Sequence, residues 1–449
     1  MSILIKSATL VDSKSNLNFK KKDILIKDGV IVDIADTIDT NANQIFDFEN
    51  LHVSKGWMDT SVSFGEPGYE ERENISNGLL TAASSGFTSI LLNPDCYPLV
   101  DTHSSVEFLK KKSLNTTTKI YPIANLTSNS NGKDLASLYD MKLAGAVAFG
   151  DYKKSIIDSS ILKIALEYTK TFGGRVVSFC QDEFLSQNGV INESIVSTEK
   201  GLKGIPHISE SINIYRDIEV LSYTGGKIHI PYVNTKKGVE LIREAKKRDL
   251  DITASVSLAH VVFSDKDIDN YNTNLKIIPP LRSETDSNSL KEGLIDGTID
   301  YLTSMHEPLN IDTKKVVFDH AAPGSIGLES VFGLMCNNFT LEKTIDILTR
   351  NKSIFEVQDQ EIKVGSHADL TLFNPDKSYE FSINHIDCTI ICETPKIGPY
   401  AKKMCENISK ITNVNVENIS IKATTTEKLG FTGRNEGIAA QATATLIRK

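Results

Sequence analysis

Eight short apolar segments, each followed by a stretch that can form an amphipathic helix, constrain the fold of this chain more than any other feature. The clearest helix, residues 236–248, places Val239, Ile242 and Ala245 on one face. Eight such units within about 250 residues are typical of a closed (β/α)₈ barrel. An open doubly wound sheet would have fewer units and a glycine-rich phosphate turn, and we find no GxGxxG or Walker motif. The expected strands are residues 56–64, 86–93, 118–124, 145–150, 174–180, 227–233, 251–257 and 298–304.

The segments on either side of the barrel have the alternating pattern of β-strands. We expect residues 1–54 and 345–385 to form one small β-sandwich domain, with the α/β barrel over 55–344 inserted between its two parts. Residues 386–449 have a pattern of their own, which predicts a partial α+β segment with the order strand, helix, strand, strand.

Composition excludes some classes of partner. The chain has 49 basic and 58 acidic residues, a net charge of −9, which gives no argument for nucleic acid or an anionic membrane. No apolar run approaches the roughly 20 residues of a membrane helix, and no secretory signal opens the sequence. The six cysteines include no CxxC pair, so we expect free thiols in a cytoplasmic protein.

Several motifs of the barrel region are long enough to identify a family. They are GWMDTSVSFGEPGYE, GFTSILLNPDCYP, GAVAFGDY, NTKKGVELIREAKKRDLDIT, IIPPLRSETD, GTIDYLTSMHEP and HAAPGSIGLES. On these motifs, residues 2–385 or so resemble a dihydroorotase of the amidohydrolase superfamily. The resemblance implies a TIM barrel, zinc as the family's cofactor, and hydrolysis of a cyclic amide in pyrimidine biosynthesis.

The same motifs depart from the family at the positions that bind metal. Its His-X-His pair corresponds to Ser61 and Ser63, and its histidines after the fifth and sixth strands correspond to Phe179 and Tyr232. Its aspartate after the eighth strand, a metal ligand and general base, corresponds to Met305. Serine is a poor zinc ligand, and Phe and Met do not replace imidazole or carboxylate. We therefore expect no bound cofactor and a catalytically inactive pseudoenzyme.

Substrate-binding positions differ as well. The family's arginine after the His pair corresponds to Gly65, and two asparagines correspond to Asp95 and Ile278. The resemblance includes inactive dihydroorotases that act as structural partners of aspartate carbamoyltransferase, which implies such a protein partner here. An active hydrolase with an atypical site is the alternative, and it would use Asp151, His260 and His306, which follow expected strands of the barrel.

The last 64 or so residues resemble a different family. ISIKATTTEKLGFTGRNEGIAAQATATLI and INHIDCTIICETPKIGPYAKKM are similar to the C-terminal part of methylerythritol cyclodiphosphate synthases, enzymes of isoprenoid precursor synthesis. The resemblance implies a cytidine diphosphate site with Glu427 on its Mg²⁺, a role that suits a carboxylate. The residues implied to contact the nucleotide are Pro395, Lys396, Ile397, Ala423, Thr424 and Thr425.

Both regions are truncated relative to the families they resemble. The synthase family takes its zinc ligands and its first strand from an N-terminal part whose place is taken here by the barrel. That loss leaves a sheet edge unpaired. We expect a fusion whose barrel is an inert scaffold, with synthase-type activity or nucleotide binding by the tail as the alternative. An oligomer is expected, and its state is left open because the two families assemble differently.

Overall fold

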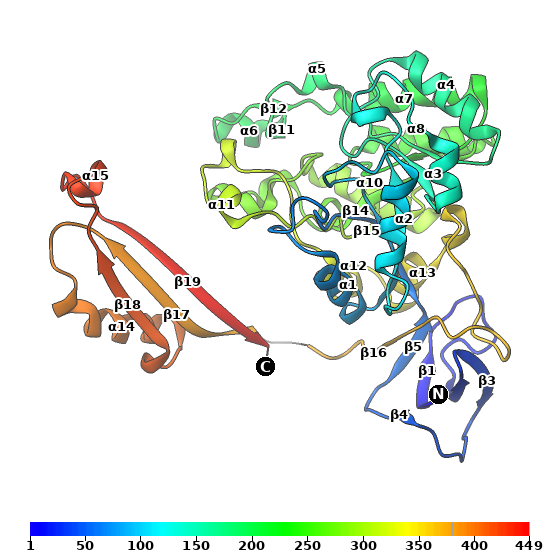
Figure 1. Ribbon diagram of the computed structural model, residues 1–449, viewed down its shortest axis with the longest axis horizontal. Helices are drawn as coiled ribbons and strands as arrows, with labels where there is room; N and C mark the ends of the chain where they lie inside the picture. The colour runs from blue at the N-terminus through cyan, green and yellow to red at the C-terminus, as the bar shows by residue number, and fades with distance from the viewer. Residues whose placement is uncertain (379–380, 449) are drawn as a thin grey trace. The chain divides into compact units, whose positions relative to one another are not determined.

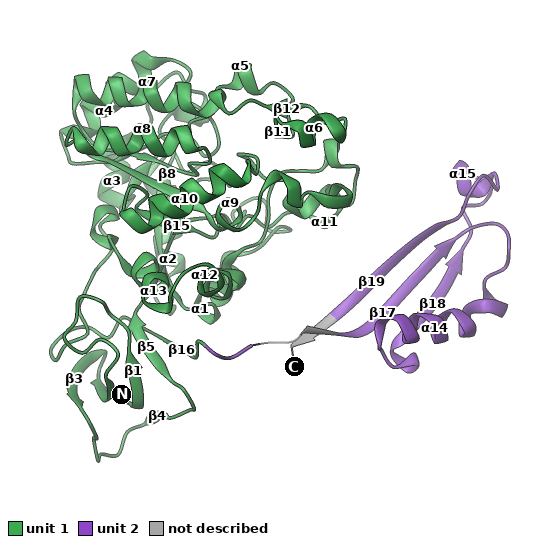
Figure 2. Cartoon of the chain, turned by 180° about the vertical axis from the view of Figure 1, so that it is seen from behind, with its two compact units in different colours: residues 1–375 green, residues 376–449 purple. Residues whose placement is uncertain are grey.

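The computed structural model describes residues 1–378 and 381–448. The chain forms two compact units, residues 1–375 and 376–449, shown in different colours in Figure 2. The second unit therefore begins about ten residues before the boundary expected from sequence.

Eight parallel strands form the centre of the first unit (Figure 1). Each expected segment contains one of them, which confirms the predicted α/β barrel. In chain order they are β6 (Trp57–Val62), β7 (Phe87–Leu92), β8 (Lys119–Ala124), β9 (Ala148–Phe149), β10 (Val176–Val177), β13 (Ile228–Ile230), β14 (Ile252–Ser257) and β15 (Tyr301–Thr303).

The first and last strands meet and close the barrel. Ser63 N donates to His306 O at 2.8 Å. The buried Asp59 carboxylate accepts from Ser304 N at 2.8 Å through Oδ2 and from Thr303 Oγ1 at 2.5 Å through Oδ1. Asp59 therefore fastens β6 to the end of β15.

Helices surround the barrel because each has one apolar face (Figure 1). In α8 (Lys236–Lys247) the predicted residues Val239, Ile242 and Ala245 are buried, and Thr235 caps the helix by accepting from Gly238 N. The other long helices are α1 (Ile75–Ser84), α2 (His103–Lys112), α3 (Leu138–Ala144), α4 (Ser159–Lys170), α7 (Ile208–Thr224), α10 (Glu284–Asp296), α12 (Val331–Asn338) and α13 (Leu341–Thr349). Shorter helices are α5 (Glu183–Ser186), α6 (Ile195–Glu199), α9 (Leu258–Val262) and α11 (Ile311–Lys314).

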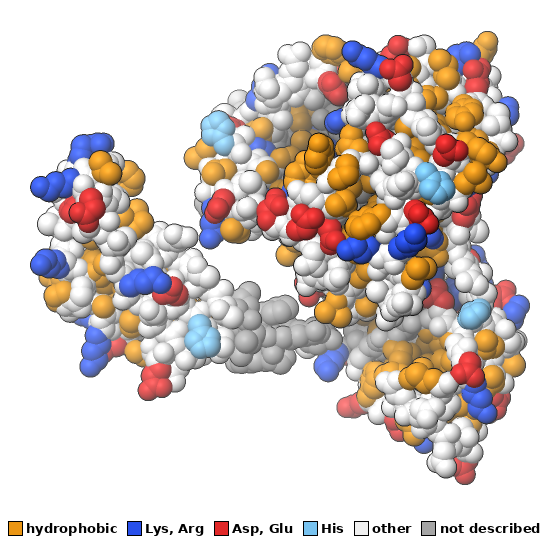
Figure 3. All heavy atoms as spheres, viewed as in Figure 1, with side chains coloured by type: hydrophobic (Ala, Val, Ile, Leu, Met, Phe, Trp, Pro, Cys, Tyr) orange, Lys and Arg blue, Asp and Glu red, His pale blue; other side chains and the backbone are white. Residues whose placement is uncertain are grey.

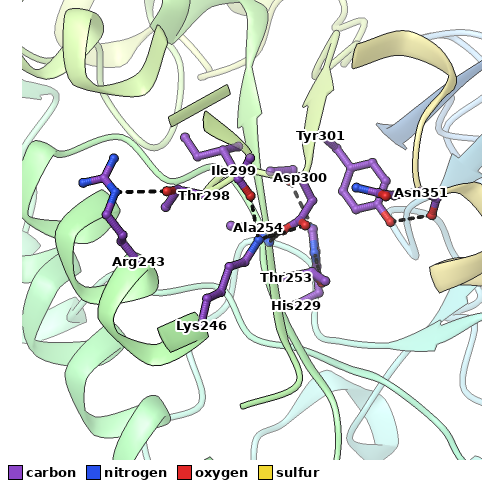
Figure 4. Close-up of polar contacts among 12 residues, drawn as sticks. His229, Arg243, Lys246, Thr253, Ala254, Thr298, Ile299, Asp300, Tyr301 and Asn351 are labelled. Atoms are coloured by element: carbon purple, nitrogen blue, oxygen red, sulfur yellow. Dashed lines mark hydrogen bonds and ion pairs between the residues drawn. The ribbon is translucent and has the colours of Figure 1, made fainter. Parts of the chain in front are cut away.

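A polar network joins α8 to the strands β14 and β15 (Figure 4). Lys246 Nζ lies 2.9 and 2.8 Å from the two oxygens of Asp300, and Asp300 Oδ2 also accepts from Ala254 N at 2.8 Å. Arg243 Nε donates to Thr298 Oγ1 at 3.1 Å. Asp300 precedes β15, at the barrel end opposite to the one where barrel enzymes place their chemistry, so this network stabilises the fold.

The small domain is a mixed sheet of six strands. Its order is β16 (Leu370–Phe373), β5 (His52–Lys55), β1 (Ser2–Leu10), β2 (Lys21–Lys27) and β3 (Val30–Ala35), with β4 (Gln44–Phe46) pairing to β1. The strand after the barrel returns to the N-terminal sheet, because β16 pairs antiparallel with β5. Residues 345–349 belong to α13, and Ile345 and Leu348 pack in the barrel core and not in the small sheet. A short separate pair, β11 (Ile191–Asn192) and β12 (Gly204–Ile205), lies between α5 and α7.

The second unit is a three-stranded sheet with one long helix. The strands β17 (Phe381–Ile391), β18 (Ile419–Thr424) and β19 (Ala439–Arg448) have the order β18-β17-β19. β17 is parallel to β18 and antiparallel to β19. The helix α14 (Gly398–Thr412) packs near β18, and a single turn, α15 (Gly430–Gly433), precedes β19. Ile386, Val414 and Ile419 form the larger of two small apolar clusters.

The surface carries mixed charge. On the face seen in Figure 3, acidic and basic side chains are interspersed, and neither sign forms a continuous field. Among the described residues, no helix combines the length and apolarity needed to cross a membrane.

Candidate functional site

Two serines lie at the barrel end where strand termini converge. Ser61 and Ser63 are buried, and Asn93 Nδ2 donates to Ser61 Oγ at 2.8 Å and to Ser63 Oγ at 3.1 Å. Ser61 Oγ also hydrogen-bonds to the Tyr232 hydroxyl. Residues at the ends of β6, β7 and β13 thus satisfy one another's hydrogen-bonding groups at the mouth of the barrel.

Large side chains fill the space beside these serines. Phe179, Tyr232 and Met305 are at most 5% exposed and belong to one apolar cluster with neighbours that include Ile277 and Leu281. The Phe179 and Tyr232 rings meet edge to face, with centroids 6.4 Å apart. The hollow left at this end, lined by residues that include Ser61, Tyr152 and Tyr232, holds about 400 Å³ including space open to solvent.

The backbone at two of these positions has an uncommon conformation. Tyr232 and Met305 lie in the left-handed region, with φ of 56° and 52°. A bulky residue with positive φ costs roughly 1 kcal/mol or more, and such residues concentrate at functional sites. The backbone at these two strand ends is therefore strained, while the side chains of Tyr232 and Met305 are packed as in a core.

The phenols at the mouth are neutral at physiological pH. Burial raises the pKa of Tyr232 well above its usual value, outweighing the hydrogen bond from Ser61. Burial also raises the pKa of Tyr152, and the nearby charge of Glu307 adds to that effect. A neutral phenol is neither a general base nor a ligand for a cation, so these tyrosines act here as hydrogen-bonding partners.

The Asp151 carboxylate accepts hydrogen bonds from a neighbouring loop. Its Oδ1 accepts from Leu126 N at 3.1 Å and from Thr127 N at 3.3 Å, and its Oδ2 accepts from Thr127 Oγ1 at 2.5 Å. Asn125 Nδ2 lies 3.3 Å from Oδ1. The carboxylate therefore holds the loop after β8.

His260 has both ring nitrogens occupied. Nδ1 lies 2.6 Å from Ser257 Oγ, and Nε2 lies 3.1 Å from Pro279 O and 3.2 Å from Pro280 O. Because a carbonyl only accepts, Nε2 carries the proton. Burial lowers the pKa of His260 to about 4, so the ring is neutral at pH 7.

His306 is held in the same manner by other partners. Its Nε2 lies 3.0 Å from Glu73 Oε2, and its Nδ1 accepts from Gly327 N at 3.2 Å. Asp151, His260 and His306 thus belong to three separate local networks, and none of their recorded hydrogen bonds joins one to another. Within the described ranges, no group of three His, Cys, Asp or Glu side chains is arranged to hold a metal ion.

In the second unit, the two loops expected to bind a nucleotide lie together. Cys392 N donates to Thr424 O at 3.1 Å, and Lys428 N donates to Glu393 Oε1 at 3.0 Å, so the ends of the parallel strands β17 and β18 form one edge. Thr425 Oγ1 donates to Glu427 Oε1 at 2.9 Å. Pro395, Lys396 and Ile397 follow on the first of these loops, directly before α14.

Comparison with known proteins identifies the barrel. The dihydroorotase of Pelotomaculum thermopropionicum is 36% identical over 385 residues, which cover 84% of this chain and 90% of that protein. The dihydroorotase of Syntrophus aciditrophicus is 34% identical over 388 residues, covering 84% of this chain and 91% of its own length. A family model described as Dihydro-orotase-like matches residues 52–238. The chain belongs to the dihydroorotase family.

Solved structures agree on the fold. The L-hydantoinase (dihydropyrimidinase) from Arthrobacter aurescens superposes with a TM-score of 0.71 at 22% identity, covering 82% of this chain and 86% of that chain. A dihydropyrimidinase from Brevibacillus agri gives a TM-score of 0.70 at 18% identity, covering 85% and 88%. The tail has a family match of its own, because the YgbB family model, of the cyclodiphosphate synthases, covers residues 370–447.

The five side chains expected from the sequence at the family's metal positions do not fit zinc. Two serine hydroxyls, a phenyl ring, a neutral phenol and a thioether supply neither imidazole nor carboxylate. Ser61 and Tyr232 already satisfy each other, and Met305 lies in an apolar cluster. No chemical step through a metal at these five positions follows from this arrangement.

Gly65 and Asp95, two residues expected from the sequence at the family's substrate positions, lie beside Arg72. Gly65 has φ of +92°, and a Cβ there would lie 2.7 Å from Tyr69 O and 3.3 Å from Arg72 Cδ. Arg72 stacks over the Tyr69 ring at 4.2 Å, and its Nη1 lies 3.4 Å from Asp95 Oδ2. The arginine next to Gly65 thus pairs with a carboxylate of the chain itself. Ile278 packs against the apolar cluster of Phe179 and Met305.

Sequence reasoning missed three residues: Asn93, which donates to both serines, Tyr152, which hydrogen-bonds to Tyr232, and Glu73, which binds His306. Asn93 ends an expected strand in LLNPD, so its position at the barrel mouth was readable. Its hydrogen bonds to the two serines were not predictable, because the family motif assigns the substrate contact to Asp95, two residues later. Glu73 gave no signal, since it lies in a loop 233 residues from its partner.

Proposed function

We infer that the barrel is a non-catalytic member of the dihydroorotase family that does not hydrolyse cyclic amides. The observation that carries this proposal is the closed network of Ser61, Asn93 and Tyr232 beside the packed Phe179 and Met305. A hydrolytic amidohydrolase needs a metal to activate water, and these positions hold no suitable ligand. The degenerate metal site is part of the proposal.

The internal pair Arg72–Asp95 supports the same proposal. A substrate carboxylate would need an unpaired cation at the barrel mouth, and the guanidinium there is stacked on Tyr69 and faces Asp95. Lys153, a second cation that lines this mouth, is paired with Glu307, and both side chains are mostly buried. Binding an anionic substrate would require breaking one of these pairs.

Assays on the full chain test the proposal. Dihydroorotate hydrolysis and the reverse cyclisation are measured with and without added Zn²⁺, and bound metal is quantified by mass spectrometry. We expect turnover at background level and no stoichiometric zinc. Zinc at one or two equivalents together with hydrolysis by the unmodified chain would overturn the proposal.

Reversion variants provide the matched comparison. Ser61→His alone should remain inactive, because one imidazole does not complete a metal site and must displace Tyr232. The combination S61H, S63H, F179H, Y232H and M305D restores the ligand types of the family, and zinc binding is expected only there. If the parent chain and S61H were both as active as the combined variant, a working site would already exist elsewhere, around Asp151, His260 or His306.

We also propose that the barrel binds a protein partner. A barrel that retains its fold without its chemistry would act through its surface, and aspartate carbamoyltransferase is the partner that family resemblance suggests. Mixing the two purified proteins and measuring their mass by light scattering tests it. Separate elution at tens of micromolar would exclude a stable complex.

A second candidate function rests on the tail. The adjacent loops at residues 392–397 and 424–428 support a cytidine diphosphate site in which Glu427 holds Mg²⁺. Hydroxyls and backbone N–H groups suit phosphate oxygens, and a carboxylate suits Mg²⁺. Cyclisation is not expected, because the family's zinc ligands lie in a part that this chain lacks.

Titration calorimetry of the full chain with cytidine diphosphate and Mg²⁺ tests nucleotide binding. Thr425→Ala and Glu427→Ala should each weaken binding at least tenfold. Ser420→Ala, an exposed hydroxyl on β18, should leave it unchanged. No measurable heat at millimolar nucleotide, or equal effects of all three variants, would eliminate this function.

A further inference from the structure

The outer edge of β19 is the longest exposed strand edge of the second unit. Among the described residues, β19 pairs only with β17, so its other side presents backbone N–H and C=O groups without a ladder partner. Residues 440–445 are exposed on both faces of the strand. An exposed strand edge of this kind is a template for pairing with another strand.

Apart from Arg448 at its last position, the sequence of β19 contains none of the residues that protect an edge. Residues 437–447 read GIAAQATATLI, with no charged residue and no proline. The one irregularity of the ladder lies on β17, between Ile383 and His385. Natural edge strands are usually short or carry a charge, proline or a bulge, whereas the first nine of the ten residues of β19 contain no charged residue and no proline.

The opposite edge of the sheet is protected, which makes β19 the preferred side. β18 has six residues and carries Lys422, which pairs with Asp387 of the neighbouring strand. The helix α14 also packs near β18, and Ile419 lies in a cluster with residues of that helix. A strand added at β18 would meet a charge and a short template.

The chemistry of the edge favours a second copy of the same strand. Antiparallel pairing of a strand with a second copy of itself is compatible with a twofold axis. Each copy then donates backbone N–H groups to the C=O groups of the other. The side chains are small and uncharged, and no like charges would face each other in any register of residues 440–445. A strand with charges would need a complementary partner, but this one needs none.

We propose that the chain forms a homodimer in which the β19 edges of two copies pair antiparallel and continue the sheet across both tails. The contact is made by backbone hydrogen bonds along residues 439–448. It does not depend on the activity of either unit.

Two measurements on the full chain test the dimer. Sedimentation velocity from 1 to 100 µM should show a concentration-dependent shift from monomer to dimer. Hydrogen exchange should show amides of residues 439–448 becoming slower as concentration rises, while those of β18 do not change. A monomer at every concentration would overturn the proposal, and so would protection of β19 that is independent of concentration, which would indicate cover by the same chain.

Charged substitutions separate this edge from any other interface. The double variant Thr443→Lys and Thr445→Lys places two lysines on one face of the strand, where the partner's lysines lie opposite or diagonal to them. Dimer dissociation should become at least tenfold more favourable. Ser420→Lys, equally exposed on the other edge, should leave dimerisation unchanged.

The outcome is interpretable because the substituted side chains are exposed. Circular dichroism and thermal unfolding should be the same for the double variant and for Ser420→Lys. A dimer that survives the double variant, with folding intact, would place the interface elsewhere and refute the proposal.

Discussion

The hydroxyls of Ser61 and Tyr232 hydrogen-bond to each other across the barrel mouth, although 171 residues separate them in the chain. Removing one partner of a buried hydrogen bond costs about 1 kcal/mol, more when the other stays unsatisfied. We expect Tyr232→Phe to lower the free energy of unfolding by about 1 kcal/mol in urea denaturation. A cycle with Ser61→Ala should give a coupling energy of at least about 0.5 kcal/mol. Tyr223→Phe, at an 80% exposed position, is the control and should have no effect.

The conformation of Gly65 predicts that an arginine or any other side chain is not tolerated there. Gly65→Ala introduces a Cβ 2.7 Å from Tyr69 O at a φ of +92°. We expect a loss of about 1–3 kcal/mol in stability. Gly333→Ala, in the exposed part of α12 with no atom within 4 Å of its Cβ, should instead be neutral or stabilising by about 0.5–1 kcal/mol. Equal unfolding temperatures for the two variants would contradict this prediction.

The buried His260 predicts a loss of stability in acid. Its pKa is about 4 in the folded chain and 6.5 in the unfolded chain, so between these values the unfolded state binds the proton preferentially. Between pH 7 and pH 5 this group should lower the free energy of unfolding by roughly 2 kcal/mol. His260→Gln keeps a donor for the carbonyls of Pro279 and Pro280 without a titrating ring. Its stability should therefore fall less than that of the parent chain, by roughly that amount, and parallel curves would exclude a role for His260.

The Lys246–Asp300 pair predicts a large effect far from the barrel mouth. Asp300→Asn removes one member of a mostly buried ion pair and weakens the acceptor for Ala254 N. Breaking such a contact is expected to cost about 1–3 kcal/mol. Glu167→Gln, which breaks the exposed pair with Lys163, should change stability by less than about 0.5 kcal/mol. A similar change in both variants would show that the network in Figure 4 contributes no more than a surface pair.

The barrel strands were predictable because each carries its own local signal. A short apolar run bounded by polar turn residues identifies a buried strand without knowledge of its neighbours, and Val239, Ile242 and Ala245 identify the buried face of α8 in the same way. The location of α13 was not predictable, because an apolar face does not indicate which of two cores it meets. Ile345 packs in the barrel, although its position in the chain suggested the small sheet.

The strand-end positions of the candidate residues were predictable, but their contacts were not. Motif matching placed Ser61, Tyr232 and Met305 at strand ends, where the structure has them. Which side chains would satisfy them depended on loops whose conformation no periodic pattern encodes. His306 illustrates this, since its partner Glu73 lies in the loop before α1 and approaches only when the barrel closes.

Barrel closure also has a consequence for the order of folding. Asp59 is made early, but the groups that it binds, Thr303 Oγ1 and Ser304 N, are synthesised about 245 residues later. Contacts between such distant residues slow folding, and in a nascent chain that ends before residue 304 burial of the Asp59 carboxylate would leave it without these partners. Every shorter intermediate on the ribosome must therefore keep Asp59 hydrated. The synthesis of the last strand of the barrel thus determines when the first strand can be buried.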